Sequence, residues 1–187
     1  MKFIRGRLEG TFIIEHDVFG DDRGFFLETY SRKKFEAAGI KVDFVQDNWS
    51  RSVRNTLRGL HYQINPGQDK LVRAVAGEIF DVAVDIRHGS PTFGQWEGCY
   101  LSAENKKQFF IPVGFAHGFC VVSESADVMY KCSDFYSPED ERGIIWNDPD
   151  INVKWPLKGE PVLSKRDLAS PTLRSSEACF RMQRPGS

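Results

Sequence analysis

Two histidines stand in strand-like segments beside glycines, where an imidazole could act as an acid or a base. His61 follows Arg58-Gly-Leu, and His117 lies in the run Phe115-Ala-His-Gly-Phe119. The stretch Leu57–Gln63 mixes apolar and aromatic residues with polar ones, which favours a pleated strand. A polar side chain on a core strand is costly unless it is hydrogen-bonded or binds a ligand. His61 is therefore either a paired core histidine or a functional group.

A metal site on these histidines is one hypothesis, because zinc and iron both accept imidazole nitrogens as ligands. Gln63 occupies the position two residues after His61 where a second histidine would serve, and this strand carries no glutamate. The chain has four cysteines but no CxxC pair, which argues against a zinc knuckle or a redox motif. The sequence therefore predicts no metal and no other cofactor.

Acid–base catalysis is the second hypothesis. It needs a base near neutral pKa, an acid on the opposite face of the substrate and a cation for developing negative charge. His61 fits the base, and a carboxylate elsewhere in the chain could orient it. Tyr130 is a candidate acid, and Lys70, which follows the loop Asn65–Asp69, could point into a cavity. A core tyrosine and a solvated strand end are the alternative interpretations of these two residues.

Short strands separated by turn residues must position these groups. We expect strands at residues 11–15, 25–30, 44–48, 57–63, 70–75, 78–86, 96–101, 108–111, 115–122 and 126–133. The one convincing helix is Arg32–Ala38, with Ser31 as its N-cap and Gly39 as its C-terminal stop. Two turns of helix cannot cover a sheet, so the pattern predicts an all-β sandwich or barrel with a few short helices.

The segment from Glu78 to Ile86 shows the strand period most clearly. Phe80, Val82, Val84 and Ile86 share one face, and the aspartates at 81 and 85 lie on the other. This alternation fits an antiparallel sheet with one face in the main core. We therefore expect the apolar face of this strand to point into the centre of the molecule.

Bulk properties set the limits of these interpretations. A chain of 187 residues with a net charge of -1 fits one domain and argues against general nucleic-acid binding. No apolar run is long enough to span a bilayer, and the charged N-terminal segment is unlike a signal peptide. Unpaired cysteines then favour a cytoplasmic protein. The polar, basic segment after Ser170 is predicted to be an extension with few contacts.

At this point eight short motifs, taken together, resemble one known family. They are Phe44-Val-Gln-Asp-Asn48, Arg58-Gly-Leu-His-Tyr-Gln63, Thr92-Phe-Gly94, Leu101-Ser-Ala-Glu-Asn105, Ile111-Pro-Val-Gly-Phe-Ala-His-Gly-Phe119, Tyr130-Lys131, Trp146-Asn-Asp-Pro149 and Leu163-Ser-Lys-Arg-Asp167. In this order they are similar to the dTDP-4-dehydrorhamnose 3,5-epimerases, from about Gly10 to about Leu168.

The resemblance implies a cupin-like jelly roll formed by residues 1–168, with 169–187 as a C-terminal extension. It implies a homodimer and a metal-free isomerase that acts on dTDP-4-dehydro-6-deoxyglucose. Such an enzyme inverts C3 and C5 and gives dTDP-4-dehydrorhamnose, on the route to dTDP-L-rhamnose. No nucleic acid and no membrane would be involved.

Roles for individual residues follow from the same resemblance. His61 would be the base, Asp167 its orienting carboxylate, Tyr130 the acid, and Lys70 the cation near the C4 oxygen. Tyr136 would stack on the thymine ring. The substrate-binding residues implied by the family are Arg23, Glu28, Gln46, Asp47, Asn48, Arg58, Gln63, His117, Tyr136, Glu141 and Arg166. Arg23 and Glu28 would act in the partner subunit's site.

One local irregularity is predicted in the strand 57–63, and three rival functions stay open. Arg58 and His61 are three residues apart, so strict alternation puts them on opposite faces. If both reach the ligand, Gly59 should mark an irregularity, or Arg58 should precede the strand.

The rival functions are a single-centre epimerase acting at C3 or C5, a cupin 3,4-ketoisomerase, and a non-catalytic carbohydrate-binding jelly roll. The presence of Tyr130 favours epimerisation at both carbons.

Overall fold

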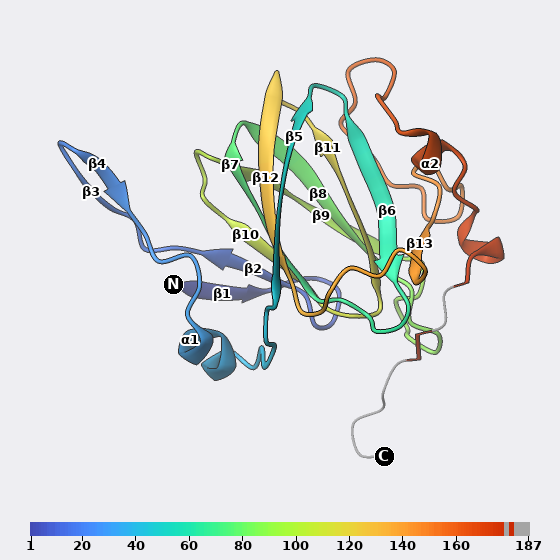
Figure 1. The fold of residues 1–187 in the computed structure, drawn as a ribbon, viewed down its shortest axis with the longest axis horizontal. Helices are drawn as coiled ribbons and strands as arrows, with labels where there is room; N and C mark the ends of the chain where they lie inside the picture. Colours follow the sequence, from blue (N-terminus) through green and yellow to red (C-terminus); the bar gives the residue numbers. More distant parts are fainter. Residues whose placement is uncertain (178–179, 182–187) are drawn as a thin grey trace.

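Two antiparallel sheets stack face to face in the computed structural model, which describes residues 1–177 and 180–181 (Figure 1). The six-stranded sheet has the order β1 (Lys2–Arg5), β2 (Phe12–Glu15), β10 (Gln108–Ile111), β7 (Lys70–Ala76), β12 (Ser125–Cys132) and β5 (Gln46–Val53). The five-stranded sheet has the order β13 (Glu141–Gly143), β6 (Leu57–Gln63), β11 (Phe115–Val121), β8 (Glu78–Asp85) and β9 (Trp96–Ser102). The all-β, jelly-roll expectation is confirmed.

Smaller elements lie outside the two sheets. The hairpin of β3 (Phe19–Asp21) and β4 (Gly24–Phe26) projects away from the body of the molecule (Figure 1). Helix α1 (Arg32–Ala37) begins after Ser31 and ends before Gly39, whose φ of 91° is easy only for glycine. Helix α2 (Lys165–Leu168) and the 3-10 helix η1 (Leu173–Ser175) belong to the C-terminal segment.

The molecule has a core on each face of the five-stranded sheet. Ile79 and Ala83 of β8 belong to the cluster between the two sheets. The apolar set of Phe80, Val82, Val84 and Ile86 belongs instead to a second cluster, which includes Ile144, Ile151, Val153 and Leu173. The predicted orientation of β8 was therefore wrong. The C-terminal segment, which includes Ile144 to Leu173, covers the outer face of the five-stranded sheet. Both faces of β8 are therefore buried, and its inner face carries Asp81.

Strand boundaries follow the sequence closely in the centre and less well at the edges. β6 and β10 begin and end as predicted. β5 begins at Gln46 and continues to Val53, and the strand predicted for residues 25–30 ends at Phe26. Tyr30 and Phe44 are in contact with each other, and Tyr30 also packs on Phe35 of α1. These aromatic residues, which look like strand residues in sequence, form a cluster under a helix.

The described part of the C-terminal segment packs on the domain, contrary to the expectation of few contacts. Leu173 is buried, and its backbone N–H donates to Asp148. Phe180 contacts the ring of Tyr62, with 6.2 Å between ring centroids. Residues 178–179 and 182–187 of the predicted extension lie outside the described residues. The boundary at residue 168 stays a prediction.

Candidate active site

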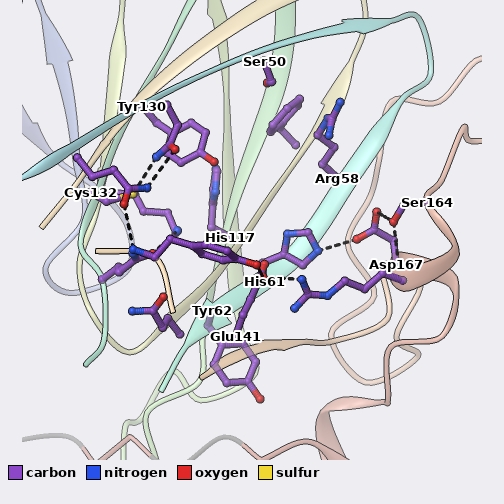
Figure 2. Close-up of a pocket in the computed structure, with 18 residues that line it drawn as sticks. Ser50, Arg58, His61, Tyr62, His117, Tyr130, Cys132, Glu141, Ser164 and Asp167 are labelled. Atoms are coloured by element: carbon purple, nitrogen blue, oxygen red, sulfur yellow. Dashed lines mark hydrogen bonds and ion pairs between the residues drawn. The ribbon is translucent and has the colours of Figure 1, made fainter. Parts of the chain in front are cut away.

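A cavity of about 430 Å³ opens between the two sheets, on the side where β5 and β6 lie (Figure 2). Its walls come from both sheets and from helix α2. Twelve of the predicted site residues line it: Gln46, Asn48, Arg58, His61, Gln63, Lys70, His117, Tyr130, Tyr136, Glu141, Arg166 and Asp167. The fold therefore brings together residues that are scattered over most of the sequence.

An irregularity in β6 lets Arg58 and His61 reach the same cavity. His61 pairs with His117 of β11, and Arg58 pairs with Phe119, so three residues of β6 span two residues of β11. Gly59, between them, has a φ of 115°, and a Cβ there would lie 2.6 Å from the carbonyl oxygen of His117. Only glycine fits such a close backbone approach. The expected irregularity at Gly59 is confirmed.

His61 is oriented by a carboxylate from the C-terminal helix. Its Nε2 lies 2.6 Å from Oδ1 of Asp167 (Figure 2). Ser164, the N-cap of α2, donates its hydroxyl to Oδ2 of Asp167 at 2.6 Å, and the backbone N–H of Gly59 donates to Oδ1 at 3.4 Å. Burial raises the pKa of Asp167, but the bonds from His61 and Ser164 outweigh burial and hold it below its usual value. Asp167 is therefore a carboxylate, and Nδ1 of His61 is left for the cavity.

A second histidine–aspartate pair lies beside the first one. Nε2 of His117 is 2.8 Å from Oδ1 of Asp81, a residue of β8 that has no exposed surface. Among the described residues, the other oxygen, Oδ2 of Asp81, has no hydrogen-bond partner. Burial raises the pKa of Asp81, although His117 and Lys70 oppose the shift. The two pairs therefore combine the same residue types in different surroundings.

Tyr130 and Lys70 stand on the opposite wall, in the six-stranded sheet. Tyr130 belongs to β12, and Figure 2 shows it across the cavity from Asp167. Burial raises the pKa of Tyr130, with smaller contributions from Cys132 and Glu141, so the phenol is protonated at neutral pH. Nζ of Lys70 lies 5.7 Å from the centroid of the Tyr130 ring. The cavity thus has an imidazole on one wall and a phenol and an ammonium on the other.

A polar cluster around Glu141 forms another part of the cavity lining. The Tyr136 hydroxyl donates to Glu141 at 2.5 Å, and Arg166 forms an ion pair with the same carboxylate. Burial raises the pKa of Glu141, but the hydrogen bonds from Tyr136 and Arg166 outweigh burial. The pKa of Glu141 is therefore below its usual value. Half of the Tyr136 surface is exposed, which leaves a ring face available for stacking.

Three predicted site residues lie outside this cavity. Asp47 points to the outer face of the sheet, where Lys131 binds it at 2.8 Å, because neighbours on a strand face opposite sides. Arg23 is at the tip of the β3–β4 hairpin and pairs with Asp21 of the same hairpin. Glu28 pairs with Lys34 of α1. The single chain therefore does not bring these three side chains to the other twelve.

Several cavity residues were missed by the sequence analysis. The cavity is also lined by Ser50, Tyr62, Gln68, Phe119, Cys132 and Ser164. Ser50 could have been found, because it continues the alternating row of Gln46 and Asn48 along β5. Ser164 could also have been found, since it precedes Asp167 by three residues, the spacing of a helix N-cap. Asp81 was noticed only as part of a polar strand face.

Within residues 1–177 and 180–181, no group of three or more His, Cys, Asp or Glu side chains is placed to hold a metal ion. No helix in the same part of the chain combines the length and hydropathy needed to cross a membrane.

Comparison with known proteins gives the family. The family described as dTDP-4-dehydrorhamnose 3,5-epimerase matches residues 5–175. The chain is 56% identical over 181 residues to the dTDP-4-dehydrorhamnose 3,5-epimerase of Pseudomonas aeruginosa, covering 96% of this chain and 99% of that protein. This chain belongs to the dTDP-4-dehydrorhamnose 3,5-epimerase family. The Escherichia coli K12 member of the family is 52% identical over 169 residues, 89% of this chain and 91% of that one.

Solved structures of dTDP-4-dehydrorhamnose 3,5-epimerases and related enzymes share the fold. A dTDP-6-deoxy-D-glucose-3,5-epimerase from Legionella pneumophila, crystallised with dTDP-4-keto-L-rhamnose, is similar with a TM-score of 0.95 and 51% identity, covering 98% of this chain and 99% of that one. A 3'-monoepimerase from Streptomyces bikiniensis, in complex with dTDP-quinovose, is similar with a TM-score of 0.85 and 37% identity over 90% of this chain and 86% of that one. The fold alone therefore does not distinguish epimerisation at two carbons from epimerisation at one.

Proposed function

We propose that this protein epimerises C3 and C5 of dTDP-4-dehydro-6-deoxy-α-D-glucose to give dTDP-4-dehydro-β-L-rhamnose, in dTDP-L-rhamnose biosynthesis. Its membership of the family and its high identity to members of that name support the reaction. Substrate and product differ only in configuration at two carbons, so the reaction needs proton transfers and no net oxidation. The cavity offers the groups for such transfers.

The first step in this proposal is enolisation. The C4 ketone acidifies the hydrogens on C3 and C5. Nδ1 of His61 removes one of these hydrogens as a proton, the C–H electron pair forms a carbon–carbon double bond, and the carbonyl π electrons move to the oxygen. The carboxylate of Asp167 stabilises the imidazolium that results. The ammonium of Lys70 stabilises the enolate oxygen.

The second step is protonation from the other face. The double-bond electrons take the phenolic hydrogen of Tyr130 as a proton, and the ketone reforms with the carbon inverted. His61 then holds one extra proton and Tyr130 lacks one, and exchange with solvent restores both groups. Repetition at the other neighbouring carbon completes the reaction. The buried, protonated state of Tyr130 suits this role.

The observation that carries the proposal is the opposition of two walls. His61, with its carboxylate, comes from the five-stranded sheet, and Tyr130 comes from the six-stranded sheet, with the cavity between them (Figure 2). A base and an acid on opposite sides of a planar enolate invert a carbon, whereas two groups on one side only exchange its hydrogen. A carbohydrate-binding jelly roll has no need of this arrangement.

In this proposal the nucleotide occupies the polar end of the cavity. Tyr136 stacks on thymine, and Glu141 orients both Tyr136 and Arg166. Arg166 and Arg58 supply forked donors for the diphosphate, a geometry that a lysine cannot offer. Gln46 is held in place by the backbone N–H of Tyr136, which donates to its side-chain oxygen at 2.9 Å. These contacts would hold dTDP whether or not the sugar reacts.

The experiment is incubation with dTDP-4-dehydro-6-deoxyglucose in heavy water, followed by NMR spectroscopy. We expect deuterium and inversion at both C3 and C5, and consumption of NADPH when the downstream reductase is added. Deuterium and inversion at one carbon would favour the monoepimerase alternative. The structural similarity to the 3'-monoepimerase from Streptomyces bikiniensis is the reason to test this alternative. Movement of the carbonyl to C3 would indicate a ketoisomerase, and no exchange at all would overturn the enzymatic proposal.

We further propose a homodimer in which the β3–β4 hairpin completes the partner's cavity. The hairpin exposes two large aromatic residues, Phe25 and Phe26, at 63% and 71% of their surface, and Trp49 on the outer sheet face is 67% exposed. Apolar surface of this kind is typical of an interface. In such a dimer Arg23 and Glu28 would reach the substrate of the other subunit.

Mixed dimers test the shared site. The variants Arg23→Ala and His61→Asn are co-expressed with different tags, and the mixed dimer is purified on both. If the hairpin acts in trans, one of its two sites carries both defects and the other carries none, so activity returns to about half of the wild-type value. If each chain completes its own site, the mixed dimer shows no recovery above the two parents.

A cytoplasmic location is the last part of the proposal. Cys99, Cys120 and Cys132 are free thiols in the structure, and Cys120 and Cys132 are buried. Free thiols suit a reducing compartment, where disulfides are rare. Fractionation of cells that produce the protein tests this location.

A further inference from the structure

The His117–Asp81 pair has no role in the mechanism above, although His117 lines the cavity and Asp81 is completely buried behind it. Asp81 lies on β8, where it faces Phe119 of β11 and Cys99 of β9 in the sheet. An acidic side chain in such a place is rare unless it is paired. Its only hydrogen-bond partner among the described residues is His117, so the function of Asp81 must be sought through that imidazole.

The two carboxylates differ in the number of donors that they accept. Asp167 accepts from three groups: the ring of His61, the hydroxyl of Ser164 and the backbone N–H of Gly59. Asp81 accepts from one ring nitrogen, and its second oxygen is buried without a partner. Hydrogen-bond donors stabilise a carboxylate, and burial without donors favours its protonated form. These surroundings therefore favour an extra proton on the Asp81 pair, relative to the Asp167 pair.

The extra proton has a structural consequence at the cavity. One proton lies between Oδ1 of Asp81 and Nε2 of His117, and it can belong to either atom. In both cases the pair has a second proton. Oδ2 of Asp81 has no partner among the described residues that could accept a hydrogen bond from a hydroxyl there, whereas His117 lines the cavity, so this geometry favours Nδ1 of His117 as the site of the second proton. In the other pair the proposed mechanism uses Nδ1 of His61 as the base, so the ring proton is on Nε2, from which it is donated to the carboxylate of Asp167. Two neighbouring imidazoles thus present opposite hydrogen-bonding character.

We propose that Asp81 is a positioning residue that keeps Nδ1 of His117 protonated, so that His117 donates a hydrogen bond to the substrate's carbonyl oxygen. The inference rests on the proposed enolisation. His61 then takes a proton from carbon, while His117 and Lys70 bind the oxygen on which negative charge develops. No covalent bond to His117 forms or breaks, and a donor aimed at an enolate oxygen lowers the barrier most when it is preorganised.

The charged and titratable surroundings agree with this assignment. Lys70 of β7 and Cys99 of β9 both interact electrostatically with Asp81, and His61 of β6 faces His117 directly in the sheet register. The thiol of Cys99 has a pKa raised well above its usual value by burial, with a smaller contribution from Asp81, so it carries no charge. Lys70 is the one cation among these neighbours, and it is the second donor to the same oxygen.

A matched pair of substitutions gives the sharpest test. In Asp81→Asn the amide can donate to Nε2 of His117, which preserves the hydrogen on Nδ1, and kcat should fall by only about 10-fold. In Asp167→Asn the same amide donation to His61 forces the hydrogen onto Nδ1 and destroys the base, so kcat should fall by about 10⁴-fold. Asp81→Val, which leaves Nε2 without any partner, should cost about 10²-fold. The conservative variant at position 81 therefore rescues most of the loss.

Asp85→Asn is the control for removing a buried carboxylate from β8. Asp85 is equally buried but binds Arg87, Ser90 and Thr92 away from the cavity, so its loss should lower Tm and leave kcat unchanged. Calorimetric binding of dTDP shows that each variant is folded. If Asp81→Val does not fold, the comparison of the two asparagine variants still decides. Equal losses in those two variants would overturn the proposal.

A spectroscopic measurement separates this inference from the proposed reaction. Nitrogen-15 NMR of the unliganded protein at neutral pH should show Nδ1 of His117 protonated and Nδ1 of His61 unprotonated, with assignment by His117→Asn and His61→Asn. The result does not depend on which substrate is used. An unprotonated Nδ1 at His117 would sink the inference while leaving the epimerase proposal intact, whereas absent turnover with a protonated Nδ1 would do the reverse.

Discussion

Two histidine–aspartate pairs stand on adjacent strands of one sheet, and their histidines pair directly in the register. The pair of His61 has its carboxylate on a helix N-terminus, where a serine hydroxyl and a backbone N–H also bind it. The pair of His117 has its carboxylate inside the sandwich with no further donor among the described residues. The difference teaches that residue identity does not determine whether an imidazole accepts or donates; the partners of its carboxylate do.

The largest expected effect contrasts the two histidines. His61→Asn removes the only base of the proposed mechanism, so kcat should fall by about 10⁴-fold. His117→Asn removes one of two donors to the enolate oxygen, and its cost should be about 10²-fold. Steady-state kinetics of both variants measure this, with dTDP binding as the control for folding. Unchanged turnover in His61→Asn, or a larger loss in His117→Asn, would contradict the assignment of roles.

Tyr130→Phe removes the acid from the opposite wall and keeps both pairs. We expect kcat for inversion to fall by about 10²–10⁴-fold, because proton return to the second face is lost. His61 can still remove a proton and give one back from its own side. NMR in heavy water should therefore show deuterium entering the substrate without inversion. Loss of exchange together with inversion would mean that Tyr130 acts earlier in the reaction than proposed.

The sequence could predict the strands better than the surroundings of the pairs. β6 was placed to the residue because its apolar and aromatic residues, Leu57, Leu60 and Tyr62, are local signals of a strand. Asp81 was missed because an aspartate on an alternating strand looks like a solvated residue; only the C-terminal segment, packed on the outer face, turns the polar face inward. That packing depends on contacts between distant parts of the chain, which no local pattern contains.

The candidate site shows the same division. The full set of proposed catalytic residues came from the family resemblance, whereas the residue types and their surroundings alone offered His61, His117, Tyr130 and Lys70 as candidates. Asp47 shows what a motif taken as a block leaves out, because the side chains of residues 46, 47 and 48 of a strand cannot all face one cavity. Arg23 and Glu28 depend on a second chain in the proposed dimer, so the position of their side chains relative to a substrate cannot follow from one sequence's strand pattern.

Thermal stability should distinguish the two carboxylates by sign. The pKa of Asp81 is raised in the native state, so the native protein loses stability as the pH rises above the pKa that Asp81 has in the unfolded chain. Asp81→Asn removes this loss and should therefore raise Tm near neutral pH. The pKa of Asp167 is lowered in the native state, so Asp167 stabilises the native protein at pH values above its pKa in the unfolded chain. This stabilisation is lost as the pH falls through its pKa in the folded protein. Asp167→Asn should lower Tm near neutral pH.

Calorimetric melting between about pH 4 and pH 8 measures both effects. Each kcal/mol corresponds to about 2–4 °C in a chain of this size. The Tm difference between wild type and Asp81→Asn should shrink toward acid pH, where the native carboxyl is protonated. A lower Tm for Asp81→Asn at neutral pH would show that Asp81 is a well-stabilised carboxylate, as Asp167 is.

The smallest expected effect comes from removing one donor to Asp167, which makes the His61 pair more similar to the His117 pair. Ser164→Ala removes the hydroxyl that binds Oδ2 of Asp167 and caps helix α2. We expect kcat to fall by about 10-fold and stability to fall by about 1 kcal/mol, the usual cost of a lost N-cap. Ser170→Ala, near the other end of the same helix, is the control and should leave kcat unchanged. Equal effects of the two substitutions would exclude a specific role for Ser164.

The carboxylate that serves His61 comes from 106 residues further along the chain. Ser164 donates to Asp167 and accepts from its backbone N–H, so the same short turn of α2 holds the carboxylate that His61 contacts. In the proposed mechanism, His61 therefore has no carboxylate partner until residue 167 has been synthesised and α2 has packed against β6. We expect a chain truncated before Ser164 to lack turnover even if its two sheets form.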